Sequence, residues 1–69
     1  MPDRNPAIEK RAAETLGQRV RRRRRELHLS QTDLAELANV NQGYISEIER
    51  DRRNPSRRTI RALAVALDT

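Results

Sequence analysis

Apolar residues recur at helical spacing along this chain, and no stretch alternates apolar with polar residues as a strand does. The first apolar stripe consists of Ile8, Ala12, Leu16, Val20 and Leu27. It predicts one helix over about 6–27, after a flexible terminus over 1–5. Gly17 interrupts this stripe at a cost of about 1 kcal/mol relative to alanine. Thr15 with Gln18 forms a capping-box pattern there, so a helix start near 15–17 is the alternative.

A second, shorter helix is predicted over 31–38. Ser30 is its N-cap candidate, and Asp33 three residues later completes a capping box. The predicted inward face consists of Leu34, Leu37 and Ala38. Asn39 tolerates the left-handed backbone that ends a helix abruptly, so the chain is expected to turn there.

Two further helices are predicted after this turn. Asn41 is the cap candidate for a helix over about 42–50, whose inward residues are Ile45, Ile48 and Glu49. Ser56 is the cap candidate for the last helix. The apolar stripe of that helix consists of Ile60, Leu63, Ala64 and Leu67. The predicted fold is therefore all-α: a compact four-helix bundle with an extended N-terminal helix, formed by residues 6–69.

The two middle helices and the turn between them meet the physical demands of a helix-turn-helix motif over 31–50. Ala35 is small enough for two helices to cross closely above it, and Val40 fills the corner. Ile45 and Ile48 anchor the second helix from below. The other face of that helix then projects outward, where it can enter the major groove of duplex DNA.

The charge distribution points to the same kind of partner. The chain has a net charge of +5, and all its basic residues except Lys10 are arginines. Two basic blocks, 19–25 and 50–61, flank an acidic stretch over 26–49. One arginine-rich block alone is equally well explained as a solvated helix face. Two blocks on either side of a helix-sized acidic element favour a polyanion, because phosphate contacts supply most of the affinity of DNA-binding proteins.

The composition argues against several other classes of protein. Without cysteine, and with His28 as the one histidine, the chain has no thiolate or histidine set for a metal, and no cofactor is expected. No nucleophile-base pair or carboxylate pair can be assembled, so an enzyme is not expected. No apolar run approaches the roughly 20 residues of a membrane span. We expect a cytoplasmic protein, since disulfides would not persist in that compartment.

The segments LGQRVR, LSQTDLA, GYISEIER and NPS resemble the lambda repressor/Cro-like helix-turn-helix family, also called the XRE family. The resemblance covers Leu16 to Leu67 and implies operator binding, usually as a homodimer on a near-palindromic site. It also implies that the protein is encoded by a bacterium or a phage. Members usually continue into a fifth helix, whereas this chain ends at Thr69. The resemblance therefore implies a truncated five-helix bundle, with a C-terminal effector or dimerisation part removed or with dimerisation arranged otherwise.

The outward face of the second motif helix offers six candidates for base recognition: Asn41, Gln42, Gly43, Ser46, Glu47 and Arg50. Gln42 is the strongest of them, because a glutamine amide pairs bidentately with N7 and N6 of adenine. Glu47 needs either a cytosine N4 amine or an arginine partner, since a carboxylate near phosphates is otherwise unfavourable. Gly43 lets the backbone approach the DNA closely.

Seven residues are candidates for phosphate contacts: Gln31, Tyr44, Arg52, Arg53, Ser56, Arg57 and Arg58. Gln31 opens the first motif helix, where its amide and the free backbone N–H groups can hold a phosphate. The arginines lie in the loop after the second motif helix and at the start of the last one. Tyr44 can place its hydroxyl on a phosphate, pack in the core, or do both.

The run of arginines over 21–25 points all round a helix axis, so these side chains cannot all face DNA. The resemblance implies that Arg24 forms a partly buried ion pair with Glu49. Losing one partner of a buried pair costs about 3–5 kcal/mol. The other arginines of the run are expected to be solvated, with one or two near phosphates.

Two functions compete for this sequence. The first is the operator-binding domain of a transcriptional regulator, which binds double-stranded DNA in the major groove. The alternative is a protein-interaction module such as an antitoxin, for which an exposed stripe of Ile60, Leu63 and Leu67 would be suited. Salt-dependent DNA binding with a sequence preference separates the two.

Overall fold

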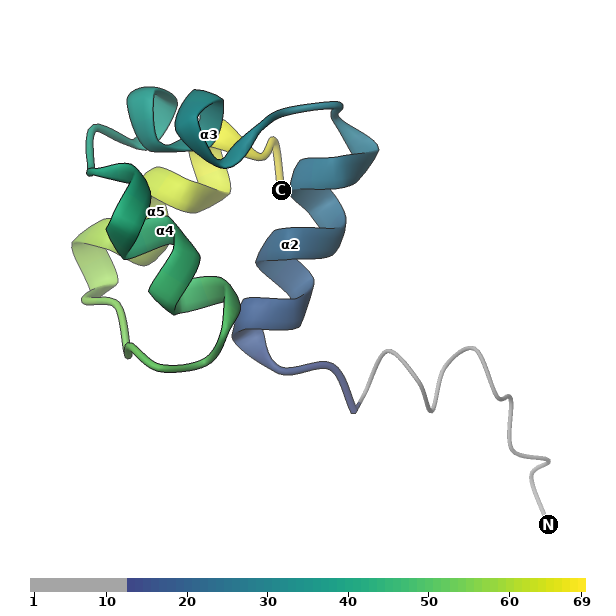
Figure 1. Cartoon of the computed structure of the whole chain (residues 1–69), viewed down its shortest axis with the longest axis vertical. Helices are drawn as coiled ribbons and strands as arrows, with labels where there is room; N and C mark the ends of the chain where they lie inside the picture. The colour runs from purple at the N-terminus through teal and green to yellow at the C-terminus, as the bar shows by residue number, and fades with distance from the viewer. Residues whose placement is uncertain (1–12) are drawn as a thin grey trace, which may run out of the picture.

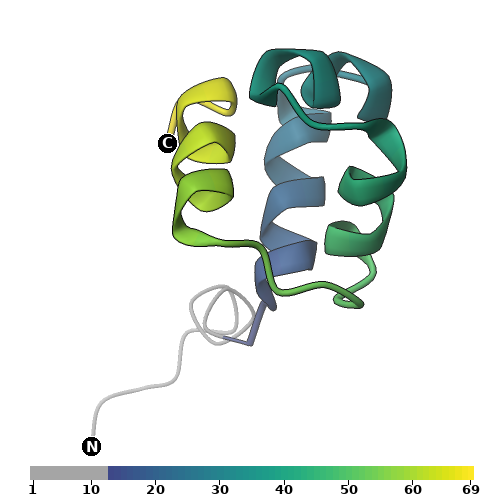
Figure 2. The same ribbon diagram turned by 90° about the vertical axis from the view of Figure 1, so that its left-hand side faces the viewer.

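The computed structural model describes residues 13–69, and these residues form four helices and no strand. The helices are α2 (Leu16–Glu26), α3 (Gln31–Ala38), α4 (Gln42–Glu49) and α5 (Arg57–Ala66). Helix α3 packs on both α4 and α5, and α2 packs on α4 (Figures 1 and 2). The all-α fold predicted from the sequence is confirmed. The terminus predicted to be flexible, residues 1–5, lies outside the described residues.

Helix α2 begins later than the apolar stripe predicted. Residues 13–15 are not helical, so the single helix over 6–27 is wrong at these positions; its first part, 6–12, lies outside the described residues. The Thr15 hydroxyl accepts a hydrogen bond from the Gln18 N–H (3.1 Å), and the Gln18 amide oxygen accepts one from the Thr15 N–H (3.1 Å). This capping box is the alternative start, and it satisfies N–H groups that a continuous helix would have bonded itself.

Gly17 is required by the packing of α2 on the end of α4. A Cβ at Gly17 would lie 2.9 Å from the Glu49 carbonyl oxygen and 2.7 Å from Asp51 Oδ1, and would also meet the Ile48 carbonyl. Asp51 Oδ1 accepts a hydrogen bond from the Gly17 N–H (3.0 Å), and its Oδ2 accepts one from the Thr15 hydroxyl (2.6 Å). The loop after α4 therefore caps the start of α2, and only glycine leaves room for this contact.

The corner between α3 and α4 is built from local hydrogen bonds. Ser30 and Asp33 form the predicted capping box at the start of α3. Asn39 ends α3 in the left-handed region, with φ at 57°, which asparagine tolerates better than most residues. The Val40 N–H then donates to the Ala35 carbonyl (2.9 Å), and Asn41 Oδ1 accepts from the Tyr44 N–H (2.9 Å) to start α4.

A small apolar core holds these helices together. Its members are Val20, Leu34, Ala35, Ala38, Ile45, Ile48, Leu63 and Leu67. The most deeply buried large side chains are Leu34, Ile45 and Ile48, each worth about 1.5–3 kcal/mol of transfer free energy. Leu37 was predicted to face inward, but it is 60% exposed. The inward stripe of α3 runs through Leu34, Ala35 and Ala38, which leaves Leu37 on the solvent side.

The last helix differs in one respect from its predicted pattern. Leu63 and Leu67 are buried in the core, so the exposed stripe expected on α5 is wrong for both. Ile60 alone of that stripe is exposed, at 42%. Across the described residues, no helix is both long and apolar enough to cross a membrane.

Candidate nucleic-acid interface

Helix α4 presents its polar face to solvent while its apolar face fills the core. Ile45 and Ile48 are buried under it. The candidates for base recognition fall on the outer side: Asn41, Gln42, Gly43 and Arg50 are exposed, and Ser46 and Glu47 are half-buried. None of the six is packed inside the bundle, so α4 is a helix whose polar side is free to meet a partner.

A buried ion pair lies directly beneath this face. Arg24 of α2 donates from Nε to Glu49 Oε2 (2.7 Å) and from Nη2 to Glu49 Oε1 (3.0 Å). Its remaining Nη1 donates to the Leu29 carbonyl (2.9 Å). Both residues are buried, with 9% and 8% exposure. The hydrogen bonds that Arg24 donates to Glu49 raise the pKa of the Arg24 guanidinium, so Arg24 stays charged and joins α2 to the end of α4.

Two glutamines extend this pair to the surface. Gln31 Nε2 donates to Glu49 Oε1 (3.1 Å), and Gln42 Nε2 donates to Gln31 Oε1 (2.7 Å). We call this series of four hydrogen-bonded side chains, Arg24–Glu49–Gln31–Gln42, the polar chain. It runs from a buried charge in α2 to an exposed amide in the first turn of α4, and so it fixes the orientation of that amide.

The outer edge of α4 carries a second, exposed cluster. Arg53 Nε lies 3.3 Å from Glu47 Oε1, and the Arg53 guanidinium carbon lies 5.8 Å from the centre of the Tyr44 ring. The sequence predicted that Glu47 pairs with either a cytosine amine or an arginine. Without DNA, its partner is Arg53. The side chains are 58% and 46% exposed, so the pair contributes at most about 1 kcal/mol and can reopen. Tyr44 is half-buried, and its ring packs against the core.

The remaining phosphate candidates flank the motif. Arg52 is exposed in the loop after α4. Ser56 caps α5 by accepting from the Thr59 N–H (3.2 Å), and Arg57 and Arg58 are exposed in the first turn of that helix. Arg57 and Arg58 thus lie at a helix N-terminus, a combination that suits an anion.

Sequence reasoning missed three parts of this arrangement. The hydrogen bond between Gln31 and Gln42 joins residues on two helices, and the residue types gave no signal that they would meet. Arg23, read as solvated, donates from Nε to the Leu67 carbonyl (2.9 Å) and so holds the end of α5 to α2. A further arginine, Arg22, pairs with Glu14 (2.8 Å) and Glu26 (3.0 Å).

An apolar hollow of about 490 Å³ lies between α2 and α5, away from the outer face of α4. The apolar part of its lining consists of Leu16, Val20, Ile60, Leu63, Ala64 and Leu67. Arg19 and Arg23 contribute charged groups to the same lining. Within residues 13–69, no group of three or more His, Asp or Glu side chains is placed to hold a metal ion.

Two short helices joined by a three-residue turn, with the second helix propped outward on an apolar base, define a helix-turn-helix protein. Comparison of the sequence with protein families agrees. The chain belongs to the helix-turn-helix family HTH_3, whose model matches residues 20–69. The resemblance inferred from the sequence motifs is therefore confirmed.

The chain is similar to two proteins of Bacillus phage phi105. It is 51% identical over 53 residues to the immunity repressor protein, a match that covers 77% of this chain and 37% of that protein. It is 34% identical over 53 residues to the ImmF control region 10 kDa protein, covering 77% of this chain and 59% of that one. The match thus spans less than two thirds of either relative.

Solved structures show the same arrangement of helices. The restriction-modification controller protein C.AhdI from Aeromonas hydrophila has a TM-score of 0.75 at 43% identity, covering 77% of this chain and 80% of that one. The P22 c2 repressor, solved in complex with a synthetic operator, has a TM-score of 0.78 at 32% identity, covering 81% and 85%. The biofilm regulator SinR, solved in complex with DNA, has a TM-score of 0.75 at 38% identity, covering 78% and 87%.

Proposed function

We propose that this chain is the operator-binding domain of a transcriptional regulator, which recognises a specific sequence in double-stranded DNA through α4. The observation that carries the proposal is the polar chain, which ends on the exposed Gln42 amide in the first turn of α4. Support also comes from the relatives, since the P22 c2 repressor and SinR were solved on an operator and on DNA.

The hydrogen bonds of Gln42 explain how it reads a base. A glutamine amide has two N–H donors and one carbonyl acceptor. Gln31 takes one of the donors, so one donor and the acceptor are left on Gln42. This is the pair of groups that adenine N7 and N6 require. The amide is already oriented before DNA arrives, which lowers the entropy lost on binding.

Phosphate contacts around α4 fix its position in the groove. The proposed contacts come from the side chains of Gln31, Tyr44, Arg52, Arg53, Ser56, Arg57 and Arg58. Arg53 leaves Glu47 to reach the backbone, and Glu47 then becomes available to a cytosine amine. Each phosphate contact raises the affinity for all sequences alike.

The remaining parts of the proposal concern the whole protein. We propose that it binds DNA as a homodimer, has no catalytic activity, and acts in the cytoplasm of a bacterium. The resemblance to phage repressors supports the dimer, because two-fold operators are matched by two-fold proteins.

Selection of bound duplexes from a random pool tests the proposal. We expect one preferred sequence, with half-sites about one helical turn apart if the protein is a dimer. Gln42→Ala should relax the preference at one base pair by about 1–3 kcal/mol, whereas Arg53→Ala should weaken binding to every duplex by a similar factor. Binding with no sequence preference by the wild-type chain would contradict operator recognition.

A second candidate function is that of a protein-interaction module such as an antitoxin. The apolar hollow between α2 and α5 is the observation that favours it, because Leu16 and Ile60 in its lining are 40% and 42% exposed and could pack against a partner. On this alternative, the chain would bind a protein partner tightly and select no duplex from the pool. Sequence-selective binding by the isolated chain would leave operator recognition as its function.

A further inference from the structure

We propose that α2 carries a second binding site for the DNA backbone, in which Arg21 and Arg25 bind phosphodiester groups of the strand that borders α4. No comparison assigns a role to these two residues. The inference rests on the proposed function, since it requires α4 to lie in the major groove. The site belongs to α2, outside the two motif helices.

The first observation is a polar hollow between the helices. It has a volume of about 250 Å³, several times the roughly 30 Å³ that one water takes up in the liquid. Its lining combines α2, α3 and α4: Arg21, Arg24, Gln31, Ser46, Glu49 and Arg50. Arg21 thus shares a hollow with Ser46 and Arg50, which lie on the outer face of α4.

The second observation is the charge of this hollow. Glu49 is its one carboxylate, and it is already bound by Arg24 and Gln31. Within residues 13–69, neither Arg21 nor Arg50 has a carboxylate oxygen within 4.0 Å of its guanidinium. Three arginines and one neutralised carboxylate leave the hollow with an excess of positive charge. A phosphate oxygen is the group that such a lining favours.

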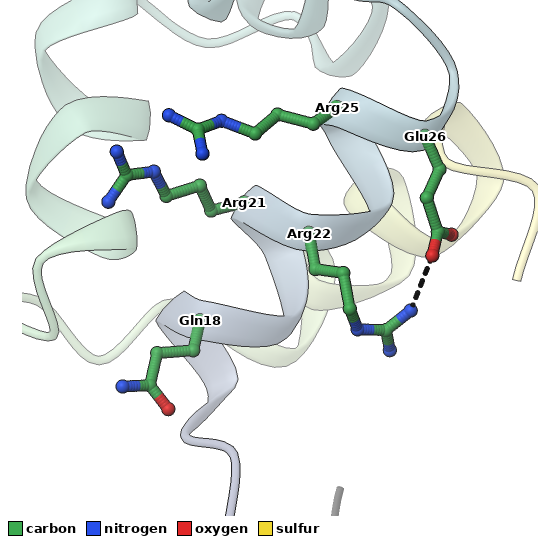
Figure 3. Close-up of a pocket in the computed structure, with 5 residues that line it drawn as sticks. All are labelled: Gln18, Arg21, Arg22, Arg25 and Glu26. Carbon is green, nitrogen blue, oxygen red and sulfur yellow. Dashed lines mark hydrogen bonds and ion pairs between the residues drawn. The ribbon is translucent and has the colours of Figure 1, made fainter. Parts of the chain in front are cut away.

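The third observation is the direction of the side chains on α2. Figure 3 shows Arg21 and Arg25 extending to the same side of the helix, away from Arg22, which turns toward Glu26. Like charges one turn apart on a helix repel each other. Arg25 lies in the last turn, where the helix dipole favours a cation, but Arg21 lies in the middle of α2 and has no such compensation. Binding of a polyanion removes the repulsion.

The dimensions of DNA connect these observations. A helix with its side chains is about 10–12 Å across, and the major groove is about 12 Å wide. A helix lying in the groove is therefore bordered by a sugar-phosphate strand on either side. Because α2 packs against α4, with Arg21 in the hollow beside Ser46 and with Arg25 on the same side of α2, these two arginines are expected to face one of those strands (Figure 3).

The test uses the full chain and the duplex that it selects from a random pool. Arg21→Gln and Arg25→Gln each remove one charge from the proposed site. Arg19→Gln is the matched control, because it makes the same change on the same helix but lines the hollow toward α5. Affinity is measured between 50 and 200 mM salt, and thermal unfolding confirms that each variant folds.

We expect Arg21→Gln to reduce the magnitude of the slope of log affinity against log salt by about 0.9 per domain, so that the affinity falls about threefold less over this salt range. The preference for the selected duplex over a random duplex should stay the same. Ethylation of one phosphate should weaken binding of the wild-type chain and have no effect on the affinity of the variant. Arg19→Gln should retain the wild-type slope.

Two results would overturn the inference. One is a slope for Arg21→Gln that equals that of Arg19→Gln, and the other is a loss of sequence preference at one base pair, which would make Arg21 a base-reading residue. Either result leaves operator recognition by α4 intact. If the wild-type chain selects no sequence from the pool, the proposed function itself fails, and this outcome is separate from the behaviour of the arginine variants.

Discussion

Replacing Glu49 with leucine should destabilise this domain more than the loss of any other single polar contact described above. The substitution removes the acceptor of three hydrogen bonds, two from Arg24 (2.7 and 3.0 Å) and one from Gln31 (3.1 Å). It leaves Arg24, whose side chain is only 11% exposed, with the Leu29 carbonyl as the one acceptor of its guanidinium within residues 13–69. Removing one partner of a buried pair costs about 3–5 kcal/mol.

That cost is large for a domain of this size. At about 0.05–0.15 kcal/mol per residue, the described part of the chain has a stability of roughly 3–9 kcal/mol. A loss of 3 kcal/mol lowers the midpoint of thermal unfolding by at least about 12 °C. Glu49→Leu should therefore lose at least about a third of the stability of the domain.

A double-mutant cycle separates the pair from the general cost of altering buried residues. Arg24→Met together with Glu49→Leu replaces both charges with apolar groups of similar volume, and such replacements are often neutral or even stabilising. The double variant should recover most of the stability that either single variant loses. Because each single variant loses about 3–5 kcal/mol and the double variant loses little, the coupling energy, measured from urea unfolding followed by circular dichroism, should be at least about 5 kcal/mol.

The exposed pair on the other side of α4 provides the control. The same cycle on Arg53→Met and Glu47→Leu should give a coupling energy of at most about 1 kcal/mol, and 1 M salt should reduce it further. Salt should have little effect on the buried pair. Equal coupling energies for the two pairs, or equal sensitivity to salt, would refute the assignment of Arg24–Glu49 as a buried pair that joins α2 to α4.

Three further predictions follow from the contacts of single residues. In urea unfolding, Gly17→Ala should destabilise the domain by about 1–3 kcal/mol despite its gain in helix propensity. Gly43→Ala is the control and should be neutral or stabilising, because its Cβ would meet only the Asn41 amide oxygen, at 3.5 Å. Asn39→Ala should cost about 1–2 kcal/mol and Asn39→Gly much less, because φ is positive there; equal losses would contradict this. Hydrogen bonds from Ser30 lower the pKa of Asp33 below its ordinary value of 3.8. The ionised Asp33 side chain therefore stabilises the fold above pH 3.8, and this stabilisation is lost as the pH falls through the lowered pKa. The difference in stability between the wild-type chain and Asp33→Ala should shrink on acidification, and a constant difference would argue against the cap.

The helices that could be predicted from the sequence are those whose signals are local. The caps at Ser30, Asn41 and Ser56 each bond the backbone within three residues, so the residue types near each helix end were sufficient to locate them. The left-handed turn at Asn39 depends on a single residue in the same way. These elements together locate the motif and its outward helix.

The errors arose where distant parts of the chain decide the structure. The start of α2 depends on Asp51, which lies 34 to 36 residues away from the groups that it caps. Nothing in the residues around Gly17 indicates that another backbone will pass there. Leu37 satisfied the helical period as well as its neighbours did, and only the crossing of α3 over α4 and α5 decided which side of the helix became the inner one.

The same difference between local and distant determinants decides which parts of the candidate site could be predicted. That Gln42 is exposed and that Arg24 meets Glu49 were expected from the pattern and from the resemblance, and the structure places these residues accordingly. The hydrogen bond between the two glutamines was not predicted, because it depends on the angle between two helices. Nor was it possible to choose, among the arginines of 21–25, the ones that face α4.

The polar chain gives Glu49 two tasks that are usually separate, since the same carboxylate neutralises a buried cation and orients the amide proposed to read a base. Each link shares a residue with the preceding link: Glu49 Oε1 accepts from both Arg24 and Gln31, and the Gln31 carbonyl then accepts from Gln42. The position of the reading amide is therefore set from α2, a helix outside the motif. It follows that an apolar replacement of the ion pair can keep the fold and still loosen base recognition, because Gln31 loses the acceptor that holds it in place.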